Sequence, residues 1–159
     1  MTIPTTAKQI AKLNQLRRLS RVLDNAIPIP GTKIRFGLDP ILGLLPGGGD
    51  TLTGGLAAYI VIEAARMGLP REVLGKMVGN ILLDSVAGTI PIVGDLFDVG
   101  WKANIKNMEL LEKHLDVNTK SKNNPLLIVG LVLLLALIVL GFAAITVFTF
   151  TWLWQQLSQ

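Results

Sequence analysis

Residues 125–154 read PLLIVGLVLLLALIVLGFAAITVFTFTWLW, thirty consecutive residues without a charged side chain. About 20 apolar residues suffice to cross a hydrocarbon core of about 30 Å, so this stretch is long enough for a transmembrane helix. The alternative is a buried helix of a soluble core, but such a helix rarely stays apolar on every face over this length. The sequence therefore predicts one transmembrane helix over residues 125–154.

Aromatic and basic residues indicate how this helix is oriented. Trp152 and Trp154 stand near its end, where an aromatic interface belt falls. Lys113, Lys120 and Lys122 precede the helix, and no basic residue follows it. Because cytoplasmic flanks carry an excess of lysine and arginine, we expect a membrane location with the N-terminal part in the cytoplasm and the short C-terminus on the opposite side.

The composition of the chain narrows the classes of protein that fit. Of 159 residues only 16% are charged, against roughly 25% in soluble domains, which is typical of a membrane protein. The chain has no cysteine and a single histidine, His114, so it offers no thiolate nucleophile and few sets of metal ligands. The glycine run 47–49 is followed by no lysine and does not complete a phosphate-binding motif. We expect no enzyme activity, no cofactor, no metal site and no nucleic-acid partner.

The first 24 residues predict a basic amphipathic helix. Apolar residues recur at intervals of three or four, and basic residues lie largely off that stripe. The apolar set is Ile10, Leu13, Leu16, Leu19 and Leu23. Two interpretations remain open: the helix lies on an anionic lipid surface, or it packs on the protein's own core with its basic face in solvent.

An internal repeat follows this helix. The sequence LDPILGLLPGGGD at 38–50 aligns without a gap with LDSVAGTIPIVGD at 83–95, an offset of 45 residues. The matched helix-breaking residues are Pro46 with Pro91 and Gly49 with Gly94. Proline stops a helix, glycine frees the backbone and aspartate caps the helix that follows, so each copy predicts a helix-break-helix hairpin. We expect a helical domain over 25–116 and a polar linker over 117–124.

Two placements of the hairpins are compatible with the sequence. Basic residues bracket two apolar stretches, 36–62 and 77–101, and the limbs on either side of each break are too short to span a bilayer. Either both hairpins enter the membrane from the cytoplasmic face and return, as re-entrant units, or they form a compact helical domain outside it. The predicted fold class is an all-α membrane protein with two helix-break-helix hairpins and one C-terminal transmembrane helix.

Five aspartates in otherwise apolar surroundings form a candidate polar site. They are Asp39, Asp50, Asp84, Asp95 and Asp98. One interpretation is a shared site at the two breaks that lines a path for a cation or for protons. An acid within a membrane costs free energy, so such a residue is a candidate for a function. The other interpretation is that the carboxylates cap helix N-termini. Asp84 distinguishes the two, because it falls within a predicted helix, where capping explains it least.

The segment from Leu23 to Leu115 resembles the family catalogued as domain of unknown function 4112. The resemblance rests on LDNAIPIPGTKIRFGLDPILGLLPGGGD, which starts at Leu23, and on the D-x-x-x-G-x-I-P-x-x-G-D element at 84–95. It implies a small membrane-associated protein, and it brings no activity, substrate or catalytic residue. The C-terminal transmembrane helix lies outside the resembling segment.

These features favour a noncatalytic integral membrane protein that serves as an accessory, scaffold or membrane-organising component. The alternative is a small oligomeric channel or transporter for a cation or protons that uses the repeated aspartates. We expect the lipid bilayer as the main partner and an anionic lipid surface as the partner of the N-terminal basic helix. A membrane protein or a second copy of the chain would be a further partner.

Overall fold

The computed structural model describes residues 7–28, 30–31, 35–37, 49–88, 101–115 and 125–158. Within these ranges the fold is all-helical apart from one short β-ladder. The helices are α1 (Ala7–Asn25), α3 (Gly49–Arg66), α4 (Arg71–Gly88), α6 (Ala103–Leu115) and α7 (Pro125–Leu157). The ladder joins β1 (Ile27–Pro28) to β2 (Arg35–Phe36) in antiparallel fashion. The predicted all-α class with one C-terminal apolar helix is therefore confirmed, and the ladder is an element that the sequence reading missed.

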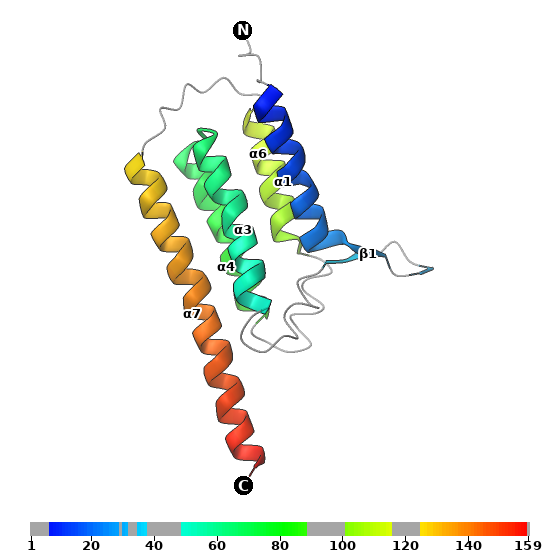
Figure 1. The fold of residues 1–159 in the computed structure, drawn as a ribbon, viewed down its shortest axis with the longest axis vertical. Coiled ribbons are helices and arrows are strands. Elements are labelled where there is room, and N and C mark those ends of the chain that lie inside the picture. The colour runs from blue at the N-terminus through cyan, green and yellow to red at the C-terminus, as the bar shows by residue number, and fades with distance from the viewer. Residues whose placement is uncertain are drawn as a thin grey trace.

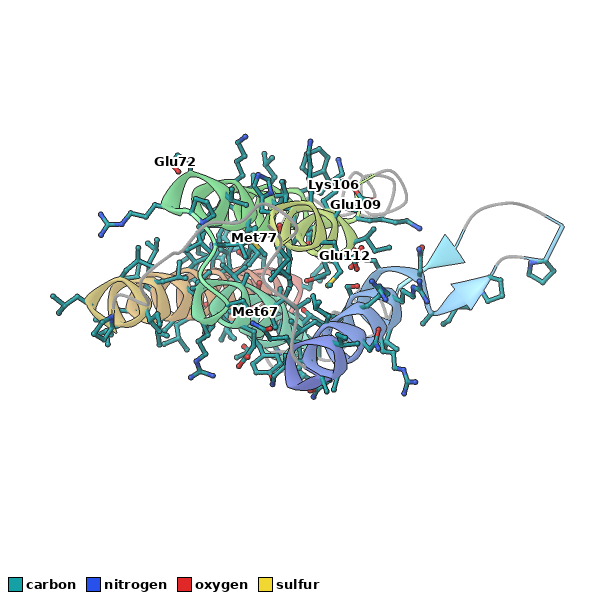
Figure 2. The ribbon with its side chains drawn as sticks, turned by 90° about the horizontal axis from the view of Figure 1, so that it is seen from above. Met67, Glu72, Met77, Lys106, Glu109 and Glu112 are labelled. Carbon is teal, nitrogen blue, oxygen red and sulfur yellow. The ribbon has the colours of Figure 1, made fainter. Side chains whose placement is uncertain are left out.

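Helices α1, α3, α4 and α6 form a bundle, and α7 packs against α3 on one side of it (Figure 1). We call the upper end of the bundle the end where α3 passes into α4, and the lower end the one where α3 begins and α4 ends. Helix α7 starts near the upper end and continues alone well past the lower end (Figure 1). Seen from above, α7 and α1 lie on opposite sides of the bundle (Figure 2). The chain thus has one helical body and one protruding helix.

The turn between α3 and α4 has the geometry that its sequence predicts. Gly68 has a φ of 89°, a left-handed conformation that glycine adopts without strain. The Gly68 amide donates to Ala65 O over 3.0 Å, and the Leu69 amide donates to Ala64 O over 3.2 Å, so carbonyls at the end of α3 are satisfied. Pro70 precedes α4, where its missing N–H is harmless. Gly68 therefore ends α3, and Pro70 leads into α4.

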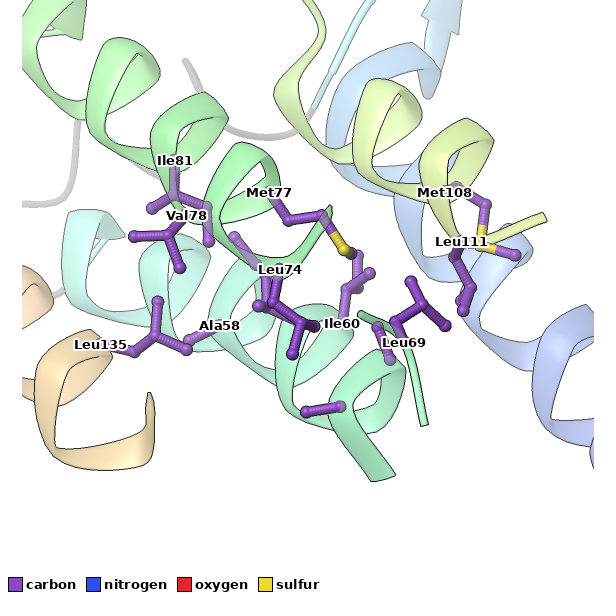
Figure 3. Packing of buried hydrophobic residues seen from close by; sticks show 14 of the residues in the cluster. Ala58, Ile60, Leu69, Leu74, Met77, Val78, Ile81, Met108, Leu111 and Leu135 are labelled. Carbon is purple, nitrogen blue, oxygen red and sulfur yellow. The ribbon is translucent and has the colours of Figure 1, made fainter. Parts of the chain in front are cut away.

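One hydrophobic core joins all five helices. Its fully buried side chains include Leu16 and Leu23 of α1, Ile60 and Val61 of α3, Met77 of α4, Leu111 of α6 and Leu135 of α7. Figure 3 shows Leu135 of α7 next to Ala58 of α3. Leucines of the α1 stripe therefore pack on the protein's own core, which is one of the two interpretations of that stripe.

Gly37 holds the segment after the ladder against the end of α1. A Cβ atom at this position would overlap the Leu23 carbonyl oxygen and crowd Asp24 Cα. Only glycine permits this close approach of two backbone segments. The segments 38–48 and 89–100, which contain both predicted breaks, lie outside the described residues.

Candidate functional site

The predicted polar site falls mostly outside the described residues. This applies to the aspartates Asp39, Asp95 and Asp98 and to the helix-break residues Pro46, Pro91 and Gly94. Gly49 and Asp50 are the first two residues of α3, so Asp50 lies in the first turn, where the helix dipole favours an acidic residue. Asp84 lies inside α4, partly buried and engaged with a neighbour. The shared site therefore stays a prediction.

Sequence reasoning missed the most buried acid of the N-terminal helix, Asp24. It is only 7% exposed and lies at the end of α1, facing the first turn of α6. Its Oδ1 accepts a hydrogen bond from Asn104 Nδ2, and its Oδ2 accepts one from the Ile105 amide, both over 2.8 Å. Free amides at a helix start attract a carboxylate, so Asp24 caps α6 from a neighbouring helix.

Burial sets the ionisation of this carboxyl group. Desolvation raises the pKa of Asp24 above its ordinary value, while the hydrogen bonds from Asn104 and Ile105 and the charge of Lys102 act in the opposite direction. Lys102 also donates from Nζ to Asn25 Oδ1, which joins the same two helix ends. Among the described residues Asn104 Oδ1 has no hydrogen-bond partner although it is buried. The junction of α1 and α6 is thus polar, buried and incompletely satisfied.

A second buried polar contact joins α6 to α4. Asn107 is fully buried, its Oδ1 accepts a hydrogen bond from Asn80 Nδ2 over 2.8 Å, and its Nδ2 donates to Met77 O over 3.2 Å. Both the oxygen and the nitrogen of the Asn107 side chain are therefore bound by residues of α4. Because buried polar groups are unfavourable unless they are paired, this contact fixes how α6 lies against α4.

A charged cluster closes the upper end of the bundle. Glu63 is 7% exposed, its Oε1 accepts a hydrogen bond from Arg66 Nη1 over 2.7 Å, and its Oε2 lies 3.6 Å from Lys12 Nζ. Lys12 also donates to the Tyr59 hydroxyl over 2.7 Å, and this hydrogen bond raises the pKa of the ammonium. The buried carboxylate is therefore neutralised by one base from its own helix and one from α1.

An aromatic and basic group lies at the start of α6. Lys106 Nζ sits 3.3 Å from the centroid of the Trp101 ring, which is a cation–π contact. Both residues and Lys102 are partly exposed. Tryptophan next to lysine is a combination typical of a membrane–water interface.

The first half of α7 forms a continuous contact with α3. Leu135 and Ile138 are buried within the shared core. Gly54 of α3 allows close approach, because a Cβ atom there would lie 3.1 Å from Val139 Cγ2. Beyond this contact α7 carries no charged residue and exposes many large apolar side chains, among them Phe148, Trp154 and Leu157. Among the described residues α7 is the helix that is long and apolar enough to cross a membrane.

In the described part of the chain these polar groups stabilise the packing of one helix against another. Asp24, Asn104 and Asn107 each join two helices, and Glu63 joins α1 to α3. No three histidine, aspartate or glutamate side chains of the described residues come together as metal ligands. One signal for these residues was present in the sequence: Asn104 and Asn107 each stand four residues before an apolar residue, Met108 and Leu111, so they share a helix face with it. Which partners they meet depends on helices distant in sequence.

The fold and its contacts define a class of protein: a small helical bundle with one long apolar helix packed against its side. The model of the family described as "Domain of unknown function (DUF4112)" matches residues 12–115, and the chain belongs to this family. The matched part ends before α7. The comparisons with curated proteins and with solved structures found no match.

Proposed function

We propose that this chain is a noncatalytic integral membrane protein, an accessory or scaffold whose α7 crosses the bilayer and presents the helical bundle at one membrane face. The observation that carries the proposal is the burial of Leu135 and Ile138 of α7 in the same core as α3. A transmembrane anchor joined to its domain only by a linker would leave the domain without a fixed orientation relative to the membrane. Here the first half of the anchor is part of the bundle, so the bundle is held in a defined orientation to the membrane.

Charge placement supports a cytoplasmic bundle. Four exposed basic residues lie in the upper part of the bundle, where α7 begins, and α7 carries no basic residue. They are Arg66, Arg71, Lys76 and Lys113. Lysine and arginine near the ends of a transmembrane helix mark its cytoplasmic side, so the short C-terminus lies across the membrane. In this orientation the lower end of the bundle, where α3 begins and α4 ends, is the end nearer the bilayer.

Exposed bases on α1 support contact with an anionic lipid surface. Arg18 and Arg21 are exposed on the lower half of α1, away from the buried leucines. Basic residues near an anionic leaflet each contribute about 1 kcal/mol of attraction. The polar outer face of α1 and α6 remains available for a protein partner, either another membrane protein or a second copy of the chain.

Two measurements test this function. The purified chain in liposomes should give no potassium or proton flux above that of protein-free liposomes, and a photo-crosslinker placed at the exposed Glu109 of α6 should join discrete proteins in native membranes. A matched crosslinker at Phe148, in the protruding half of α7, should give fewer protein adducts. A flux that is abolished by Asp84→Asn would contradict the scaffold and favour a channel.

A further inference from the structure

The length of α7 sets the depth of the bundle relative to the membrane. The helix has 33 residues, about 50 Å at about 1.5 Å per residue, whereas the hydrocarbon core measures about 30 Å. Trp152 and Trp154 are exposed near the C-terminal end, and tryptophan favours the interface. With Trp152 at the far interface, about 20 residues lead back to a near boundary close to Val132.

Helix α3 is fixed to the part of α7 that lies inside this boundary. Gly54 is level with Val139, as the 3.1 Å approach to Val139 Cγ2 shows. Val139 lies seven residues beyond Val132, which is about 10 Å along the helix. Gly54, in the second turn of α3, is therefore placed about 10 Å inside the hydrocarbon of the near leaflet.

The outer surface of the bundle changes character at the corresponding level. On the outward face of α4, Arg71, Glu72 and Lys76 are exposed near the upper end. Toward the lower end the exposed residues of the same face are Leu82, Leu83 and Val86, at 37%, 50% and 53% exposure. We call these three residues, together with Leu52 of α3 at 53% exposure, the apolar tip.

The basic residues of the other two helices lie above this tip. Figure 1 shows α3 extending further along α7 than α1 and α6 do. The lower ends of α1 and α6 therefore lie nearer the headgroups than the beginning of α3 does. These ends carry Arg18 and Arg21 on α1 and Lys102 and Lys106 on α6, with Trp101 beside Lys106. The apolar residues lie at the lower end, and the basic residues with a tryptophan lie above them. This is the order found from the hydrocarbon to the headgroups at a membrane interface.

We propose that the apolar tip inserts into the acyl chains of the leaflet nearest the bundle, beside α7. The proposal rests on the proposed function, because it requires α7 to cross the bilayer. The lipid of that leaflet is the occupant because both helices that carry the tip, α3 and α4, contact α7, which is uncharged throughout. Three helices then occupy the near leaflet and α7 alone crosses the far one, so the protein has the cross-section of a one-sided wedge.

The absence of native cysteine allows a test with single-cysteine variants. Leu83→Cys reports the tip, and Lys76→Cys is its matched control, two turns away on the same face of α4. Phe148→Cys reports the protruding half of α7. Each full-length variant is labelled with an environment-sensitive fluorophore and reconstituted in phosphatidylcholine–phosphatidylglycerol vesicles. The quenchers are aqueous iodide and nitroxides placed at shallow and deep positions of the acyl chains.

The expected result is that the label at position 83 is blue-shifted, quenched by the shallow nitroxide and protected from iodide, while the label at 76 shows the reverse. Quenching of the label at 83 by iodide alone overturns tip insertion. Protection of this label from both quenchers also overturns it, because it indicates that a second copy of the protein covers the tip. Quenching of the label at 148 by the deep nitroxide supports the anchor in either case, so the two proposals fail separately. Val86→Cys serves if Leu83→Cys does not fold.

Discussion

Replacement of Asp24 by alanine should weaken the junction of α1 and α6 strongly, because this one side chain accepts two hydrogen bonds from α6. The carboxylate accepts hydrogen bonds from Asn104 Nδ2 and from the Ile105 amide, both over 2.8 Å. Its removal leaves two donors unpaired, each worth about 1–3 kcal/mol when buried. Relief of the desolvated charge offsets part of this loss, so we expect a decrease in the free energy of unfolding of about 2–4 kcal/mol.

The assay is amide hydrogen exchange of the full chain in detergent micelles, combined with denaturant unfolding followed by circular dichroism. A loss of 2 kcal/mol corresponds to roughly 30-fold faster exchange at Ile105 if α6 opens locally. Arg21→Ala, an exposed position one turn earlier on α1, is the matched control and should change stability by less than about 0.5 kcal/mol. Equal exchange at Ile105 in the two variants would refute the cap.

Asp24→Asn distinguishes the charge of this group from its hydrogen bonds. The amide keeps an acceptor for the Ile105 amide, and its Nδ2 can donate to Asn104 Oδ1, which has no partner among the described residues. We therefore expect a smaller loss of stability than for alanine.

The same variant also tests the effect of burial on the pKa. Burial raises the pKa of Asp24, so between the ordinary aspartate pKa and this raised pKa the folded chain holds more protons than the unfolded chain. The associated stabilisation is complete below the ordinary pKa and is lost as the pH rises through the raised pKa. The free energy of unfolding of the wild type should therefore fall relative to Asp24→Asn in this window, and parallel pH profiles would contradict the raised pKa.

Three further substitutions test other contacts. Gly54→Leu should destabilise the packing of α3 on α7 by about 1–3 kcal/mol, measured as loss of thermal stability in detergent, whereas Gly55→Leu, with open space around it, should not. Gly68→Ala should lower the free energy of unfolding by about 1 kcal/mol because of its positive φ, a value to be read from denaturant titration. Asn107→Ala should lose about 1–3 kcal/mol by leaving its partner asparagine on α4 unpaired, against no change for the exposed Glu109→Ala. Equal effects within either matched pair, or an unchanged Gly68→Ala, would contradict the corresponding contact.

Local signals were sufficient to predict several elements of the fold. The uncharged run at 125–154 falls within α7, and Gly68 with Pro70 separates α3 from α4, because hydropathy, backbone freedom and the missing proline N–H act within a few residues. Of the apolar stripe of the N-terminal segment, Leu16 and Leu23 are buried, Leu13 and Leu19 are partly buried, and Ile10 is exposed. Such features require no knowledge of distant partners.

The polar contacts could not be derived in this way. In α6 the polar Asn104 is buried, whereas the apolar Ile105 beside it is partly exposed, which is the reverse of what hydropathy alone would predict. Asn104 is buried because Asp24, eighty residues earlier in the chain, supplies its partner. The packing of α7 on α3 is also non-local, since it depends on which helix presents a glycine to Val139. Pairings of this kind are set by the tertiary fold.

The placement of the bundle and the C-terminus on opposite sides of the membrane is tested most directly by labelling from each side. Single-cysteine variants Lys76→Cys and Gln156→Cys, both at exposed positions, are treated with a membrane-impermeant maleimide in sealed vesicles of known sidedness. We predict that position 76 is labelled only from the cytoplasmic side and position 156 only from the other side. Labelling of both positions from the same side would contradict a membrane-crossing α7.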